Sequence, residues 1–168
     1  MSHTKSAFAA VDPHAPDTLR HAFASFATGV TIITALDEHG RAVGMTANSF
    51  GSVSLDPPLV QWSLRVNSGL HRIFVDATHF SVSVLAAHQT HIAKQFASRA
   101  PDRFIDIALL EVTGEPPLIR GALAYFVCKK IAVHRVGDHE LFVGEVLRAS
   151  AHEGAPLLFH ASKFIASR

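Results

Sequence analysis

Short segments with the composition of β-strands, separated by turn residues, fill most of the chain after residue 30 and restrict the folds open to it. The segments are 30–36, 42–55, 59–64, 79–85, 122–136, 140–150 and 156–159. Residues 79–85 alternate with a period of two, as a half-buried strand does. Because so few helices separate these segments, they favour an antiparallel closed barrel over a βαβ layer fold. We therefore predict a mainly β protein with peripheral helices.

Turn residues divide these segments into hairpins. Asp37-Glu-His-Gly40 predicts a hairpin between residues 30–36 and 42–55. Val136-Gly-Asp-His139 predicts a second hairpin between the two long segments. Asp56-Pro57-Pro58 ends the extended segment 42–55, because proline cannot donate to a strand ladder. Residues 156–159 are expected to close the sheet.

Three stretches have helical periodicity, and a polar arm precedes them. Residues 1–16 contain two prolines and are expected to form a flexible N-terminal arm, followed by one domain over residues 17–168. The first helix is expected to run from Asp17 or Thr18 to about Ala27 and to end at Gly29. A short helix capped by Ser68 would place Leu70, Ile73 and Phe74 inward, and a helix over residues 86–98 would align Ile92 with Phe96.

The composition indicates a globular chain and excludes several classes of function. Of the 168 residues, 48% are hydrophobic and 17% are charged. The formal net charge of +1 argues against non-specific nucleic-acid binding, which requires many basic residues. Apolar runs are too short to span a bilayer, and the N-terminus lacks the apolar region of a secretory signal, so a cytoplasmic protein is expected. The rather high hydrophobic fraction hints at a subunit interface.

Histidine is abundant, but the sequence does not predict a metal site. The chain has twelve histidines and a single cysteine, Cys128. His88 and His91 lie three residues apart on an expected helix, yet no HExxH-type cluster supplies three converging ligands. Surface histidines with local hydrogen bonds are the simpler interpretation. Phosphate loops, GxGxxG fingerprints and nucleophile elbows are absent as well.

The segment 43–54 is extended yet rich in small and hydroxyl residues. Such a strand lets a flat ligand approach the backbone closely. Thr46, Asn48 and Ser49 could donate hydrogen bonds to the polar edge of a ring. An ordinary serine-rich barrel strand would have the same composition, so this segment alone does not decide between the two.

Two further segments carry polar side chains at the ends of strands. Residues 63–69 place Arg65 before an expected helix start, where backbone N–H groups attract anions. A plain helix capped by Ser68 is an equally good interpretation. In the second segment, 137–139, a tight turn presents His139, either to a ligand or simply as a polar hairpin tip. The loop 101–104 could cover a bound ring.

Taken together, these segments resemble the flavin reductase family, which has the FMN-binding split β-barrel fold. The resemblance runs from about residue 20 to residue 164. It rests on Phe26-Ala-Thr-Gly-Val-Thr31, Gly44-Met-Thr-Ala-Asn-Ser-Phe50, Ser52-Val-Ser-Leu-Asp-Pro-Pro-Leu-Val60, Pro101-Asp-Arg-Phe104, Gly121-Ala-Leu-Ala124, Gly137-Asp-His139 and Pro156-Leu-Leu-Phe159. Each motif is common alone, and their order along one chain is specific.

The resemblance implies a homodimer with a flavin site near the subunit boundary. Its implied isoalloxazine contacts are Val43, Gly44, Met45, Thr46, Asn48 and Ser49. Its implied ribityl and phosphate contacts are Ser63, Leu64, Arg65, Val66, Asn67 and Ser68. Residues flanking the outer part of the flavin would be Ala97, Ser98, Arg99, Asp102 and Phe104. His139 would place the nicotinamide, with help from Phe159 and His160.

The implied activity is the reduction of FMN or FAD by NADH or NADPH, with reduced flavin supplied to a separate monooxygenase. Relatives often carry a second hydroxyl residue after the position of Ser68, whereas Gly69 and Leu70 follow it here. Phosphate binding would then depend on Arg65, backbone N–H groups and His71, which leaves the choice between FMN and FAD open. The alternatives are a flavin-binding electron carrier or sensor, a flavin-free barrel and a pyridoxamine-phosphate oxidase-like enzyme.

Overall fold

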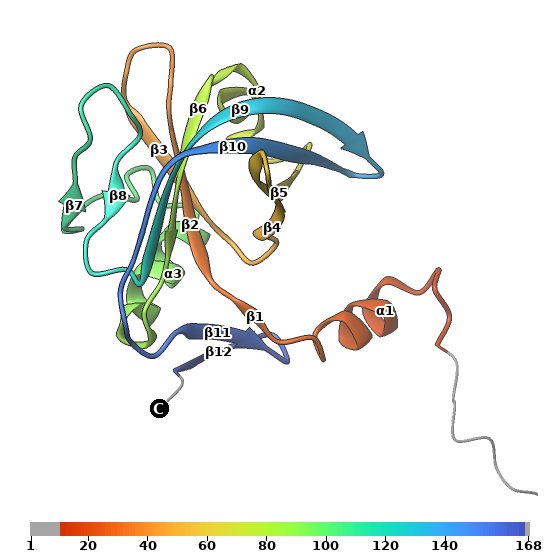
Figure 1. Cartoon of the computed structure of the whole chain (residues 1–168). Coiled ribbons are helices and arrows are strands. Elements are labelled where there is room, and N and C mark those ends of the chain that lie inside the picture. Colours follow the sequence, from red (N-terminus) through yellow and green to blue (C-terminus); the bar gives the residue numbers. More distant parts are fainter. Residues whose placement is uncertain (1–10, 167–168) are drawn as a thin grey trace, which may run out of the picture.

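A curled seven-stranded antiparallel sheet forms the body of the molecule in the computed structural model, which describes residues 11–166 (Figure 1). Its strand order is β3-β2-β6-β9-β10-β5-β4. The strands are β2 (Thr31–Leu36), β3 (Ala42–Ala47), β4 (Gly51–Leu55), β5 (Pro58–Arg65), β6 (His79–Val84), β9 (Ala124–Val136) and β10 (His139–Ala151). The predicted mainly β architecture is confirmed.

Both predicted hairpins are present. β2 pairs with β3 across the Asp37–Gly40 turn, where Gly40 has a φ of 74°. The long strands β9 and β10 are joined by Gly137 and Asp138, and the φ of 59° at Gly137 is one that glycine adopts without strain. Two irregularities in their register, at Val143/Gly144 and Val146/Arg148, allow this hairpin to bend with the sheet.

The segment 42–55 is not one strand, as the sequence predicted, but two strands at opposite edges of the sheet. β3 ends at Ala47, residues 48–50 cross from one edge to the other, and β4 begins at Gly51. Both halves have strand composition, so periodicity alone gives no sign of the crossing. Two of the three linking residues, Asn48 and Ser49, are among the predicted ligand contacts.

Two small sheets accompany the main one. β1 (Thr28–Gly29), β11 (Leu157–His160) and β12 (Lys163–Ala166) form a three-stranded sheet, and β7 (Leu109–Leu110) pairs with β8 (Leu118–Ile119). The expectation that residues 156–159 would close the main sheet is therefore wrong. Leu157 is buried in an apolar cluster and bonds to Val30 and Leu85 through its backbone, which holds β11 against the barrel end.

The core is built around stacked aromatic rings. Trp62 of β5 is fully buried and stacks on Phe142 of β10, with ring centroids 4.3 Å apart. Phe74 and Phe80 meet Trp62 edge-on. A Cβ at Gly144 would overlap the Phe80 ring, so the close approach there requires glycine.

The helices are peripheral. They are α1 (Pro16–Phe23), α2 (His71–Asp76) and α3 (Thr90–Ala97), and a 3-10 turn, η1 (Ala87–Gln89), precedes α3. Ile92 and Phe96 of α3 are buried, as predicted, and so is Phe74 of α2, whereas Leu70 and Ile73 are only partly buried. None of the helices within residues 11–166 combines the length and apolar composition that crossing a membrane requires.

Two predicted helix boundaries are wrong. α1 ends at Phe23 rather than near Ala27, and Gly29 lies in β1. No residue of α1 is buried, and the helix extends away from the barrel (Figure 1), so nothing packs on it to lengthen it. α2 starts at His71 and not after Ser68, because Ser68 instead accepts a bond from the Leu70 N–H in a tight turn. Residues 1–10 of the predicted arm lie outside the described residues.

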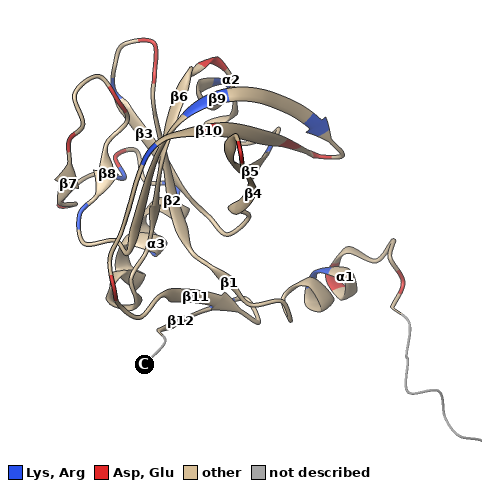
Figure 2. Ribbon diagram, viewed as in Figure 1, with Lys and Arg blue, Asp and Glu red and all other residues tan. Residues whose placement is uncertain are grey.

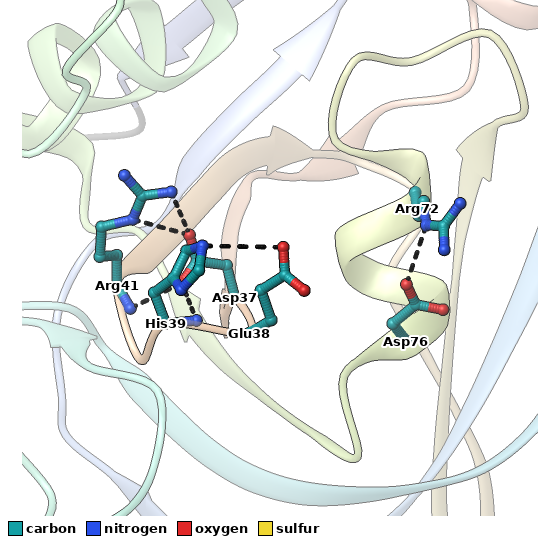
Figure 3. A network of polar contacts seen from close by, with 6 residues as sticks. All are labelled: Asp37, Glu38, His39, Arg41, Arg72 and Asp76. Carbon is teal, nitrogen blue, oxygen red and sulfur yellow. Dashed lines mark hydrogen bonds and ion pairs between the residues drawn. The ribbon is translucent and has the colours of Figure 1, made fainter.

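Basic and acidic residues are dispersed over the barrel (Figure 2), and the densest polar network lies at the β2–β3 turn (Figure 3). Asp37 accepts bonds from the N–H groups of His39 and Arg41 and from the Arg41 guanidinium, each at 2.9 Å. The Arg41 backbone bond is the largest of the contributions that lower the pKa of Asp37. The ionised carboxylate therefore stabilises the turn.

This network predicts how stability changes with acid. Because the pKa of Asp37 is lower in the folded chain, its contribution is complete above the ordinary value of 3.8 and disappears as pH falls through the folded value. The Asp37→Asn variant should unfold at a lower temperature than the wild type at neutral pH, and this gap should narrow below pH about 4. Thermal denaturation of both proteins over a range of pH measures this difference in unfolding temperature.

Asp76→Asn is the matched control, because the Asp76 carboxylate is exposed, pairs with Arg72 within one helix and acts on Lys130 only through charge. It should change the unfolding temperature little at any pH. A gap for Asp37→Asn that stays constant into strong acid would contradict the assigned role of the carboxylate.

Candidate functional site

A pocket of about 300 Å³ lies where the chain crosses between the two edges of the sheet. Three elements form it: the end of β3 with the crossing, the end of β5 with the turn after it, and the start of β10. The lining residues are Met45, Thr46, Ala47, Asn48, Ser49, Ser63, Leu64, Arg65, Asn67, Ser68 and His139. All of them except Ala47 are among the predicted site residues, so the fold brings together segments that are far apart in the sequence.

Two of the predicted hydroxyl donors are already used to build the walls of this pocket. Ser49 Oγ accepts a bond from the Ser63 N–H at 3.0 Å and donates to the Ser63 carbonyl at 3.2 Å. Thr46 Oγ1 donates to the carbonyl of Ala93 in α3 at 2.6 Å. Asn48 is exposed, and its side-chain amide has no partner among residues 11–166. Contacts to a ligand therefore fall to Asn48 and to the backbone rather than to these hydroxyls.

The other wall carries a positive charge. Arg65 is exposed at the end of β5, and Asn67 and Ser68 follow it in a turn closed by the bond from the Ser68 N–H to the Arg65 carbonyl at 3.0 Å. α2 begins at His71, six residues after Arg65, so the helix start lies further along the chain than the sequence suggested. The Arg65 guanidinium is the cation that an anionic group would meet here.

His139 lies beside Arg65, since the two residues are partners in the β5–β10 ladder. Its Nδ1 is 2.7 Å from Asp138 Oδ1, and this bond is the first cause of the lowered pKa of Asp138. An Nδ1–H that donates to the carboxylate leaves Nε2 available to a ligand. Asp138 was not predicted to orient His139, although both residues belong to the Gly137-Asp-His139 motif.

A smaller hollow of about 140 Å³ adjoins this pocket and contains Val43, Gly44, Asp102 and Phe104. Arg103 donates from Nη1 to the Gly44 carbonyl at 2.8 Å, which ties the loop 101–104 to β3. The Phe104 ring packs edge-on against Phe96 at 4.9 Å, and a Cβ at Gly44 would lie 2.7 Å from that Phe96 ring. Gly44 and Phe104 thus serve the packing of this loop. Arg103 was not predicted.

Six predicted residues line neither hollow of the single chain. They are Val66, Ala97, Ser98, Arg99, Phe159 and His160. Ala97 to Arg99 lie at the end of α3, and Ser98 Oγ donates to the Gln95 carbonyl. Phe159 and His160 lie on β11, where Phe159 packs against Phe164 at 5.3 Å. Their assigned contacts remain predictions.

Larger hollows contain none of the predicted site residues, among them one of about 550 Å³ lined by residues that include His88, Arg120 and His152. A hollow of about 600 Å³ is lined by residues of the β2–β3 turn and α2, but its charged groups are paired with one another, as Asp37 with Arg41 and Arg72 with Asp76 (Figure 3). A search of residues 11–166 finds no group of three or more potential metal ligands. The crossing pocket is therefore the candidate site.

Comparison with known proteins identifies the family of this chain. Residues 23–167 match the family described as "Flavin reductase like domain". The chain is 45% identical over 148 residues to the FMN reductase (NADH) SmoA of Agrobacterium fabrum, covering 88% of this chain and 83% of that protein.

Solved structures share the fold. The NADH:FAD oxidoreductase SgcE6 of Streptomyces globisporus, in complex with NAD and FAD fragments, superposes with a TM-score of 0.90 at 36% identity, covering 96% of this chain and 98% of that chain. The styrene monooxygenase flavin reductase of Pseudomonas putida does so with a TM-score of 0.81 at 37% identity, covering 89% and 96%. The split-barrel chain described above belongs to the flavin reductase family.

Proposed function

We propose that this chain is a flavin reductase that transfers a hydride from NADH or NADPH to FMN or FAD and supplies reduced flavin to a separate monooxygenase. The observation that supports it most is the crossing pocket, in which an accessible strand end, a guanidinium and an oriented histidine converge. The family match and the relatives named as NADH-dependent reductases point the same way.

The chemistry of the pocket fits a flavin. Residues 45–49 offer a narrow wall of backbone and mostly small side chains, which a flat ring can approach closely. Backbone N–H groups and the Asn48 amide would hydrogen-bond the polar edge of the ring. Arg65, Asn67 and Ser68 would hold the phosphate, with Arg65 providing the charge. Ser49 and Thr46 would act indirectly, by fixing the positions of the backbone donors.

Hydride transfer needs little from the protein beyond binding and orientation. When bound, the nicotinamide and flavin supply the redox chemistry themselves. Residues 46–49 would stabilise negative charge on the reduced ring with donors that are already fixed. His139, held by Asp138, would orient the nicotinamide through Nε2. The reaction requires no nucleophile or strong base from the protein. His139 is the one lining side chain of the pocket that could act as a base.

The names of the relatives indicate which nicotinamide nucleotide is used, but not which flavin. SmoA and SgcE6 are both named for NADH, so we propose NADH ahead of NADPH. One is named for FMN and the other for FAD, so the flavin has to be measured. We further propose action in the cytoplasm, where reduced nicotinamide nucleotides are regenerated.

Exposed apolar side chains support a homodimer. Leu55 at the edge of the sheet is 93% exposed, and Val53 beside it is 54% exposed. Phe23 and Phe26, near α1, are 68% and 78% exposed. Large apolar residues gathered at an edge strand are usually covered by a partner, and a second copy of this chain would cover them.

The activity is tested by mixing purified protein with NADH and with FMN, FAD or no flavin, and following the loss of nicotinamide absorbance. Oxidation should require added flavin and be faster with one of the two. If neither flavin supports oxidation with either nicotinamide, the proposal is wrong. Flavin binding without turnover would instead assign the chain to electron carriers or sensors.

The role of His139 is tested by His139→Ala. Losing one hydrogen bond to the nicotinamide should raise the KM for NADH by about tenfold, while the Kd for flavin changes less than about twofold. Steady-state kinetics and a flavin titration give both values. His134→Ala, an exposed histidine on the same hairpin, is the control and should match the wild type. Unchanged NADH kinetics in His139→Ala would remove His139 from the site.

A further inference from the structure

The turn over residues 66–70 carries two of the proposed phosphate contacts, Asn67 and Ser68, but few bonds attach it to the barrel. Among the described residues, its hydrogen bonds are mostly local, such as Ser68 N–H to Arg65 O and Leu70 N–H to Ser68 Oγ. One bond, from the Val66 N–H to the Asp138 carbonyl at 3.1 Å, reaches another element. Local bonds fix the shape of a turn, but they do not fix its position relative to the sheet.

A second long-range bond follows directly after this turn. His71 Nε2 lies 2.6 Å from Glu140 Oε2, and the two side chains are only 25% and 18% exposed. An imidazole N–H that donates to a carboxylate is a charge-assisted bond, stronger than a neutral one, and partial burial protects it from screening. It joins the first residue of α2 to β10.

The His71–Glu140 pair lies outside the pocket. His139 lines the pocket, and successive side chains of a strand face opposite sides, so the neighbouring Glu140 faces away from it. Neither His71 nor Glu140 lines the pocket. His71 is therefore engaged with Glu140 instead of serving as the phosphate contact that the sequence suggested.

We propose that the His71–Glu140 pair positions the phosphate-binding turn relative to His139, an inference that rests on the proposed flavin site. Three consecutive residues, 138–140, then fix the positions of both His139 and the phosphate-binding turn. Asp138 orients His139 and accepts the Val66 bond, while Glu140 holds His71.

The rest of α2 has further anchors, although Glu140 also acts on one of them, Lys130, through charge. Phe74 is buried in the aromatic core, and Lys130 Nζ donates to the carbonyls of Phe74 and Val75 at the other end of the helix. Breaking the His71–Glu140 bond should therefore loosen Asn67 and Ser68, while Leu70, which packs against the core, and the helix stay in place. The expected defect is in flavin affinity, with hydride transfer at saturating flavin largely retained.

The test measures the Kd of FMN and FAD from the quenching of Trp62, the single tryptophan, together with kcat and the KM for flavin. His71→Phe and Glu140→Ala should each raise the flavin Kd and KM by about tenfold, as expected for the loss of one charged hydrogen bond. Glu140→Gln, which can still accept the bond, should restore most of the affinity. The double variant His71→Phe/Glu140→Ala should be no weaker than either single variant, because both remove the same bond.

Arg72→Ala is the matched control on the same helix, since its ion pair with Asp76 is exposed and local. Thermal denaturation checks that each variant is folded at the assay temperature. The double variant leaves neither the unpaired carboxylate of His71→Phe nor the unpaired imidazole of Glu140→Ala. Wild-type Kd values in folded His71→Phe and in the double variant would overturn the proposal, as would a Glu140→Gln defect equal to that of Glu140→Ala. A wild type that binds neither flavin would instead refute the proposed function.

Discussion

The crossing from β3 to β4 is the constraint on which the rest of the structure depends. The four steps from Ala47 to Gly51 can span at most about 14 Å. In a flat seven-stranded sheet the two edge strands would lie about 29 Å apart. The sheet must therefore curl until its edges approach each other, and the two bonds between Ser49 and Ser63 fix the crossing against β5. The pocket lies at this junction, between the ends of β3 and β5 and the start of β10.

The same junction explains why hydroxyl residues are concentrated in this part of the chain. Ser49 bonds the backbone of Ser63 beyond the last β4–β5 pair, and Thr46 bonds a carbonyl of α3, so that the Asn48 amide remains for a ligand. A serine-rich strand and a ligand site were competing interpretations of the sequence. In the structure both hydroxyls are bonded within the fold, and the proposed ligand surface is the one that they hold in place.

Much of the fold could be predicted from the sequence, and the failures have physical causes. Hairpins at Asp37–Gly40 and Val136–His139 were predictable because turn chemistry is local. The split of residues 42–55 was not, because the crossing is imposed by pairing with distant strands. The end of α1 was missed because its apolar residues have no partner within the described chain, and the start of α2 because Ser68 forms a local turn that competes with a helix cap. Within the site, types and positions of the lining residues were largely predicted, whereas contacts such as Arg103 to Gly44 and His71 to Glu140 join segments whose proximity only the fold creates.

A crystal structure of this chain soaked with FMN and FAD tests the central claim most directly. The account predicts a flavin with its ring against residues 45–49 and its phosphate near Arg65 and Ser68. A flavin bound elsewhere on the barrel, with the crossing pocket empty at saturating concentration, would contradict it.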